Sequence, residues 1–236
     1  MPLTTLSVHD VIRATPRTRL LRIETQASAF RYHAGQAVMV GLHGSPLRKP
    51  YSIASAPSET ARTGNIELLV QVDDSGGPDP HLERAAPGTR LDVEGPFGSF
   101  SLPPVEDEPA LLMVAGGTGI APLRSMMIEA LSRPVPPRIS VVYSARSVDE
   151  LAYRDDLEAL AANRRIDLVL TVTRDEGSGW TGMRGRIDRA MLAAALPGTR
   201  AWCLICGPQA MIADVRASLS LLGVPDSQVG IERYDV

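Results

Sequence analysis

The fold is decided by the stretch Ala110-Leu111-Leu112-Met113-Val114-Ala115-Gly116-Gly117-Thr118-Gly119-Ile120-Ala121-Pro122. Its first six residues form an apolar run that is typical of a buried strand. The glycines then allow a tight turn, and the proline suits the first turn of a helix. Because amides at a helix N-terminus attract anions, the stretch predicts a strand, a phosphate-binding turn and a helix, with a plain tight turn as the alternative. It is neither a G-x-G-x-x-G fingerprint nor a P-loop.

Strands and helices alternate from Pro109 to the end of the chain. Apolar runs at 139–143, 166–172 and 202–205 predict three more strands, and apolar periodicity near 149–162 and over 211–222 predicts helices. This alternation predicts an α/β domain with a parallel sheet over residues 109–236.

In the first hundred residues, apolar and polar residues alternate with a period of two. Ile66, Leu68, Val70 and Val72 alternate with Glu67, Gln71 and Asp73, and Gly, Pro, Asn and Asp interrupt such runs at short intervals. Short alternating strands with frequent turns predict an antiparallel β-barrel over residues 1–103. The acidic, proline-rich segment 102–109 is the expected linker.

Composition restricts the function classes. The chain has 236 residues and a net charge of −3 without a basic run, which argues against a nucleic-acid partner. It has no signal-peptide core or membrane-length apolar run, so we expect a cytoplasmic protein without a membrane span. Cys203 and Cys206 are too few for an iron–sulfur cluster, and the four histidines are not clustered in sequence, so we expect no metal site.

Three further segments carry candidate chemistry. Lys49-Pro50-Tyr51-Ser52 brings a cation, an aromatic ring and a hydroxyl together on an extended segment. Gly95-Pro96-Phe97-Gly98-Ser99-Phe100 predicts either a hairpin turn or a close approach to a ligand. Cys206-Gly207-Pro208 follows an apolar strand, which places the thiol at the carboxyl edge of the sheet, where α/β proteins bind ligands.

Taken in this order, the four segments resemble the ferredoxin–NADP reductase family of flavoprotein reductases. The resemblance covers nearly the whole chain and implies FAD in the barrel and NADPH or NADH in the α/β domain. By resemblance, Lys49 contacts the FAD pyrophosphate, Tyr51 packs on the isoalloxazine and Ser52 lies near flavin N5. The other flavin-side candidates are Pro50, Gln71, Gly76 and Gly77.

Two departures from the family pattern lie on the flavin side. Lys49 replaces an arginine, which removes the bidentate fork. In the expected pyrophosphate loop at 75–82, Pro80 stands near the position of a serine and Asp79 is close by. Both changes predict weaker phosphate contacts, and they leave FMN open as an alternative to FAD.

The resemblance also assigns the coenzyme side. The pyrophosphate would lie at Gly116, Gly117, Thr118, Gly119 and Pro122, and the nicotinamide at Cys206, Gly207, Pro208 and Met211. The tail resembles the family's Glu-x-aromatic ending, with Glu232 close to the flavin and Tyr234 shielding its ring, unless it is only an edge strand. A ribose 2′-phosphate would be held by Ser144, Arg146, Arg174 and Arg184, which favours NADPH over NADH unless these arginines form a solvated loop.

The expected activity is hydride transfer between NAD(P)H and bound FAD, with Ser52, Cys206 and Glu232 at the reacting junction. Electrons would pass to a separate acceptor, such as the small redox proteins ferredoxin or flavodoxin. Three alternatives remain: a reductase component of an oxygenase or multi-subunit redox complex, a reductase of free flavins, and a binding module without activity.

Overall fold

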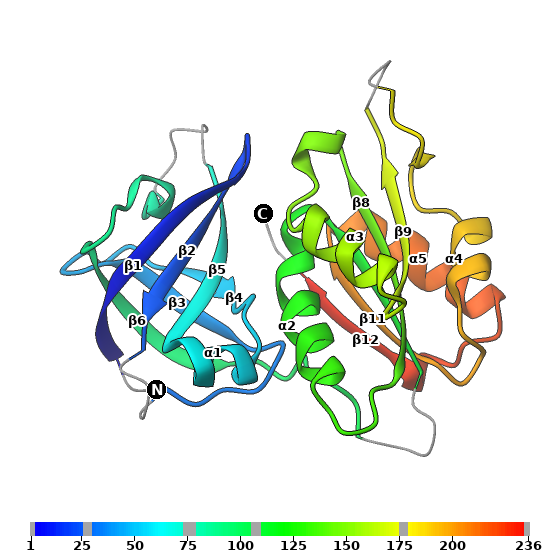
Figure 1. The fold of residues 1–236 in the computed structure, drawn as a ribbon, viewed down its shortest axis with the longest axis horizontal. Coiled ribbons are helices and arrows are strands. Elements are labelled where there is room, and N and C mark those ends of the chain that lie inside the picture. Colours follow the sequence, from blue (N-terminus) through cyan, green and yellow to red (C-terminus); the bar gives the residue numbers. More distant parts are fainter. Residues whose placement is uncertain (1–2, 26–29, 73–78, 105–109, 175–178, 234–236) are drawn as a thin grey trace. The chain divides into compact units, whose positions relative to one another are not determined.

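A computed structural model describes residues 3–25, 30–72, 79–104, 110–174 and 179–233 of the chain. The chain divides into two compact units, each with its own sheet. The first comprises Met1–Leu102 together with Arg124–Glu129, and the second comprises Pro103–Leu123 and Ala130–Val236. Figure 1 labels the elements of both.

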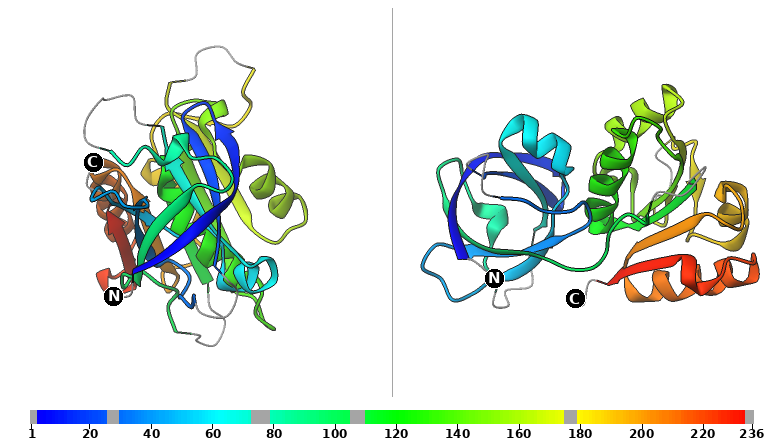
Figure 2. Two further views of the ribbon diagram at one scale, coloured as in Figure 1. Left: turned by 90° about the vertical axis from the view of Figure 1, so that its left-hand side faces the viewer. Right: turned by 90° about the horizontal axis from the view of Figure 1, so that it is seen from below.

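The first unit is a six-stranded antiparallel barrel. Its sheet has the order β4-β3-β6-β1-β2-β5, and an antiparallel bridge between Ile53 and Leu68 joins the end of β4 to β5, which closes the barrel (Figures 1 and 2). The strands are β1 (Leu3–Thr15), β2 (Thr18–Glu24), β3 (Ala37–Leu42), β4 (Lys49–Ser52), β5 (Asn65–Gln71) and β6 (Arg90–Phe97). Two short helices accompany them, α1 (Pro57–Thr63) and the 3₁₀ helix η1 (Leu82–Arg84).

Alternating apolar residues fill the interior of this barrel. Leu21 and Ile23 on β2, and Ile66 and Leu68 on β5, are fully buried in one core cluster. A six-stranded barrel packed in this way leaves no room for a ligand along its axis. Binding groups of this unit therefore have to come from the strand ends and the outer surface.

The second unit is a six-stranded parallel sheet of order β10-β9-β8-β7-β11-β12. Helix α3 covers one face of the sheet, and α4 and α5 cover the other (Figure 2). The strands are β7 (Ala110–Gly116), β8 (Arg138–Ala145), β9 (Asp167–Val172), β10 (Met183–Arg184), β11 (Trp202–Gly207) and β12 (Val229–Arg233). The helices are α2 (Ile120–Leu131), α3 (Arg154–Ala162), α4 (Arg189–Ala195) and α5 (Gln209–Leu221), with 3₁₀ turns η2 (Gly117–Gly119), η3 (Val148–Glu150) and η4 (Asp226–Gln228).

The strand order creates a switch point beside β7. The chain runs outward from β7 through β8 and β9 to β10, and then returns to place β11 and β12 on the other side of β7. Open α/β sheets bind ligands at the carboxyl ends of the two strands that flank such a reversal. These ends are the glycine turn after Gly116 and the segment after Cys206.

The predicted fold class is confirmed, with differences at element boundaries. The helix expected near 149–162 begins at Arg154, because Tyr153 has a φ of +60° and separates it from η3. At Gly95 and Pro96 the chain does not reverse, since β6 runs on through Phe97 and pairs there with Ala37. Within the described part of the chain, no helix is both long and apolar enough to cross a membrane.

Candidate functional site

The carboxyl edge of the parallel sheet gathers several of the residues selected from sequence. Gly116 on β7 pairs with Ser144 on β8, and Cys206 on β11 pairs with both Ala115 on β7 and Glu232 on β12. Parallel register therefore brings segments far apart in sequence to one row at the switch point. This row forms the coenzyme-side candidate site of the second unit.

The glycines of this row are required by close packing of the backbone. A Cβ on Gly116 would lie 2.6 Å from the Sδ of Met211 and 2.9 Å from the Cδ of Pro208. A Cβ on Gly119 would overlap the carbonyl oxygen of Cys206. The turn after β7 is thus seated directly on the turn after β11, so the two predicted motifs form one structure.

Gly117 differs from its neighbours because it faces open space. Its φ is +55°, a left-handed conformation that glycine adopts without strain, and a Cβ there would meet no atom of the described residues within 4 Å. The backbone next to it continues through η2 into α2, so this exposed glycine lies at the start of a helix. An open backbone at a helix N-terminus is a suitable place for a coenzyme phosphate. Half-buried Thr118 and buried Pro122 complete the segment.

Tyr143 fixes this turn from the neighbouring strand, and sequence reasoning missed it. Its hydroxyl donates to the carbonyl oxygen of Gly117 at 3.2 Å and accepts from the backbone N–H of Ala152 at 3.2 Å. The side chain is fully buried, and burial raises the pKa of its hydroxyl well above the usual value. Its place in the apolar run 139–143 suggested only a core residue, because nothing in that run indicates a polar partner.

Cys206 and Glu232 approach each other across the pair β11 and β12. The thiol sulfur of Cys206 lies 4.0 Å from Oε2 of Glu232 and donates a weak hydrogen bond to it. Cys203 lies on the same strand, far from this carboxylate in register, and burial raises the pKa of its thiol to about 12. Both cysteines are free thiols, as the interpretation of Cys203 as a small buried hydrophobe requires.

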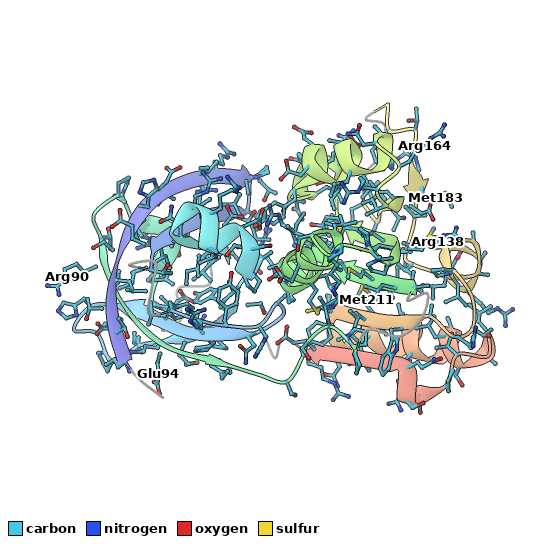
Figure 3. The ribbon with its side chains drawn as sticks, turned by 60° about the horizontal axis from the view of Figure 1, so that its bottom comes forward. Arg90, Glu94, Arg138, Arg164, Met183 and Met211 are labelled. Atoms are coloured by element: carbon cyan, nitrogen blue, oxygen red, sulfur yellow. The ribbon has the colours of Figure 1, made fainter. Side chains whose placement is uncertain are left out.

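Met211 lies in the first turn of α5 and packs on Gly116 and Gly207. Its side chain lies over the ends of the central strands β7 and β11, whereas Met183 lies on the edge strand β10 (Figure 3). Pro208 precedes the helix, and its carbonyl oxygen accepts from the backbone N–H of Ile212. The segment after Cys206 is therefore a rigid helix start.

The arginines selected for a 2′-phosphate lie at the ends of β8, β9 and β10. The backbone N–H of Arg174 donates to the carbonyl oxygen of Arg146 at 2.7 Å, so these two residues are neighbours, and both side chains are exposed. Arg184 pairs with Val172 in the sheet, and its guanidinium donates to the carbonyl oxygen of Trp180 at 3.1 Å. Ser144 is half-buried at the end of β8. Arg146 and Arg174 are therefore better placed than Arg184 to meet an anion from solvent.

The flavin-side residues lie on β4 in the first unit. Tyr51 is half-buried and packs against the barrel core, and Ser52 is buried. Pro50 and Gln71 are exposed, the latter at the end of β5. Arg48 lies 3.9 Å from Oδ2 of Asp92, so its guanidinium serves a different acid from that of Lys49.

Lys49 forms an ion pair with Asp79. Its ammonium contacts Oδ2 of Asp79, whose other oxygen accepts from the backbone N–H of His81 at 2.7 Å. The Lys49 ammonium could thus bind a phosphate, but in this structure it is paired with the Asp79 carboxylate. Pro80, near the position where the family pattern has a serine, is buried. Gly76 and Gly77 on the flavin side, and Tyr234 in the tail, lie outside the described residues.

Asp79, His81 and Glu83 alternate along one segment, and one potential ligand atom from each lies within 4.8 Å of the others. This grouping was missed because it contains a single histidine. The Lys49 ammonium, through its ion pair with Asp79, already provides this acidic group with a counter-ion.

Comparison with known proteins agrees with both halves of this description. The oxidoreductase FAD-binding domain model matches residues 4–102, and the oxidoreductase NAD-binding domain model matches residues 113–217. Ferredoxin–NADP reductase B of Sorangium cellulosum (strain So ce56) is 36% identical over 232 residues, which cover 94% of this chain and 93% of that protein.

Solved structures share the fold. The ferredoxin reductase in carbazole 1,9a-dioxygenase matches with a TM-score of 0.83 at 23% identity, over 100% of this chain and 70% of that chain. A ferredoxin NADP⁺ reductase from Neisseria gonorrhoeae with bound FAD and NADP matches with a TM-score of 0.79 at 20% identity, over 99% of each chain. With a full-length relative at 36% identity and a cofactor-domain match on each unit, the chain belongs to the ferredoxin–NADP reductase family and is an FAD-containing, NAD(P)H-dependent oxidoreductase.

Proposed function

We propose that this reductase passes electrons from a nicotinamide coenzyme, through its FAD, to a separate one-electron carrier of the ferredoxin or flavodoxin type. FAD supplies the redox chemistry, because a flavin accepts a hydride and can release electrons singly. The protein supplies binding and alignment.

The observation that carries this proposal is the similarity to a ferredoxin–NADP reductase over 94% of the chain. The whole sequence contains two cysteines, whereas a four-thiolate iron–sulfur cluster needs four. Both lie on β11, where Cys203 is enclosed in the core and Cys206 faces Glu232. We propose that electrons leave the flavin for another molecule. The name of the Sorangium relative supports a ferredoxin as that molecule.

We propose residue roles separately for each of the two units. On β4, Lys49 would bind the flavin pyrophosphate, Tyr51 would pack on the isoalloxazine, and Ser52 would offer its hydroxyl near flavin N5. Pro50 and Gln71 would flank the flavin. We propose residues 1–103 as the flavin domain and 109–236 as the coenzyme domain.

On the coenzyme side, the open backbone at Gly117 would receive the pyrophosphate. Cys206 and Glu232 would hold the nicotinamide, and their contact supports a joint role. The exposed pair Arg146 and Arg174 would bind a 2′-phosphate, which makes NADPH the preferred coenzyme.

The test is reduction of cytochrome c by the purified protein with NADPH, with and without added ferredoxin or flavodoxin. We expect reduction to be slow without a carrier and to rise saturably with its concentration. Equal rates with and without either carrier would contradict the proposed acceptor class. We propose the cytoplasm as its compartment, because such carriers and NADPH are present there.

A second candidate keeps the chemistry and changes the partner. The structural match to a ferredoxin reductase in carbazole 1,9a-dioxygenase is consistent with a dedicated oxygenase reductase, although at 23% identity it supports only the fold. A stable complex with an oxygenase subunit on co-purification would favour this candidate over a diffusing carrier. Free-flavin reduction would instead require flavin that is lost on gel filtration.

A further inference from the structure

We propose that Asp79 is an affinity-setting residue of the flavin site: by holding the Lys49 ammonium, it lowers the affinity for the phosphate groups of the flavin. The inference rests on the proposed function, in which Lys49 binds the flavin pyrophosphate. Binding of a phosphate does not require an acidic residue, and the inference assigns an affinity-setting role to Asp79.

The two partners of this ion pair differ in how firmly they are held. The Asp79 side chain is 7% exposed, and its Oδ1 accepts from the backbone N–H of His81 at 2.7 Å. The Lys49 side chain is 44% exposed, and its ammonium ends a flexible four-carbon stem. The carboxylate is therefore fixed in position, and the ammonium is the partner that can turn toward a ligand.

A second acid strengthens the negative field around Asp79. The Glu83 side chain is 6% exposed, and its Oε1 lies 3.2 Å from Nδ1 of His81. Its Oε2 is buried and has no hydrogen-bond partner among the residues that the structure describes. Arg84 lies 3.3 Å from Oε1 of Glu83 and offsets part of this charge. The ligand atoms of Asp79, His81 and Glu83 lie within 4.8 Å of one another, so a phosphate that approaches Lys49 meets two carboxylates.

The neighbouring cation cannot replace Lys49 in this role. Arg48 is directed toward Asp92, with 3.9 Å between its guanidinium and Oδ2 of that acid. A lysine presents one compact charge, whereas an arginine fork could hold a phosphate bidentately. A flavin phosphate thus has to compete with Asp79 for the Lys49 charge.

The experiment measures flavin binding to the flavin-free full-length chain by quenching of flavin fluorescence. It compares the wild type with Asp79→Asn, using FAD, FMN and riboflavin as probes. Asparagine keeps the oxygen that accepts from His81 and replaces Oδ2, which contacts Lys49, with an uncharged amide NH2 group. We expect Asp79→Asn to tighten FAD and FMN about tenfold and to leave riboflavin, which has no phosphate, unchanged.

The matched control is Asp10→Asn, which removes one negative charge from an exposed ion pair with Arg22 in the same unit. Its FAD affinity should equal that of the wild type. The same substitution at Asp79 in a Lys49→Met background tests the mechanism, because the gain should shrink once the ammonium is absent. Thermal unfolding confirms that each variant is folded.

Several results would overturn the inference. FAD affinity of Asp79→Asn within twofold of wild type would do so, as would an equal gain for riboflavin, or an undiminished gain in the Lys49→Met background. In these cases FAD still binds and the proposed function stands. If neither the wild type nor Asp79→Asn bound FAD, the proposed function itself would fail, and this inference with it.

Discussion

The thiol of Cys206 lies 4.0 Å from Oε2 of Glu232, across two neighbouring parallel strands at the carboxyl edge of the sheet. The two residues are 26 positions apart in sequence, and the register of β11 and β12 brings them together. A polarizable thiol beside a carboxylate gives this edge two groups that can contact a nicotinamide ring.

Cys206→Ala should slow flavin reduction by NADPH about tenfold or more while leaving flavin content unchanged, because small errors in coenzyme alignment are costly in hydride transfer. Stopped-flow absorbance of the flavin measures the rate. Cys203→Ala makes the same change elsewhere on the same strand and should leave the rate per flavin unaltered. A Cys206→Ala enzyme that transfers hydride at the wild-type rate would remove Cys206 from the mechanism.

Gly119→Ala should disrupt the packing of the turn after β7 against the turn after β11. The new Cβ would overlap the carbonyl oxygen of Cys206, and overpacking against backbone costs about 2 kcal/mol or more. We expect a lower free energy of unfolding in urea and loss of flavin reduction by NADPH. Gly44→Ala is the control, since the φ of Gly44 is +79° but a Cβ there would meet no atom of the described residues within 4 Å. That variant should lose about 1 kcal/mol and keep full activity, and equal behaviour of the two variants would refute the packing argument.

Arg174→Gln should raise the KM for NADPH about tenfold and change the KM for NADH little, because only NADPH carries the 2′-phosphate. Arg174 is exposed beside Arg146, to which its backbone is hydrogen-bonded. Steady-state kinetics with both coenzymes measure the effect. Arg138→Gln, at the other end of β8 and paired with Asp167, is the control. Parallel rises in both KM values would show that Arg174 does not read the phosphate.

Asp92→Asn should destabilise the fold in a pH-dependent manner. The hydrogen bond from His43, aided by those from Thr5 and Gly44 and opposed by burial, lowers the pKa of Asp92 from 3.8 to about 2. A depressed pKa contributes stability above pH 4, and this contribution is lost as the pH falls toward 2.

At pH 7 we therefore expect Asp92→Asn to cost on the order of 1 kcal/mol in urea unfolding, and the difference from wild type to shrink as the pH falls below 4. Asp167→Asn, in an exposed ion pair with Arg138, should show no comparable difference at any pH. A constant gap between Asp92→Asn and wild type from pH 7 to pH 3 would contradict the assignment.

Two patterns of apolar residues in the sequence predicted the fold. Alternation at Ile66, Leu68 and Val70 indicated a barrel strand, and β5 is buried at all three. The apolar run before Gly116 indicated a parallel strand, and β7 is the sheet's switch strand. Both patterns record burial directly, which is why they sufficed. The start of α3 was missed because the left-handed φ of Tyr153 leaves no trace in hydrophobic periodicity.

The site was only partly predictable, because its most important contacts join residues that are far apart in the sequence. Cys206 and Glu232 were predicted separately, each from its own sequence segment. Their contact arises from the register of β11 and β12. Tyr143 looked like an ordinary core residue, and only the structure shows its hydroxyl bound to Gly117. Asp79 was noted near the phosphate loop, but its ion pair with Lys49 depends on how β4 and the segment before η1 come together.

Anaerobic titration of the purified protein with NADPH and, separately, NADH shows whether a nicotinamide coenzyme reduces a flavin bound by this chain. We expect a bound-flavin absorbance that either coenzyme bleaches, with NADPH effective at the lower concentration. A protein that carries no flavin, takes up no added FAD and oxidises neither coenzyme would rule out this activity.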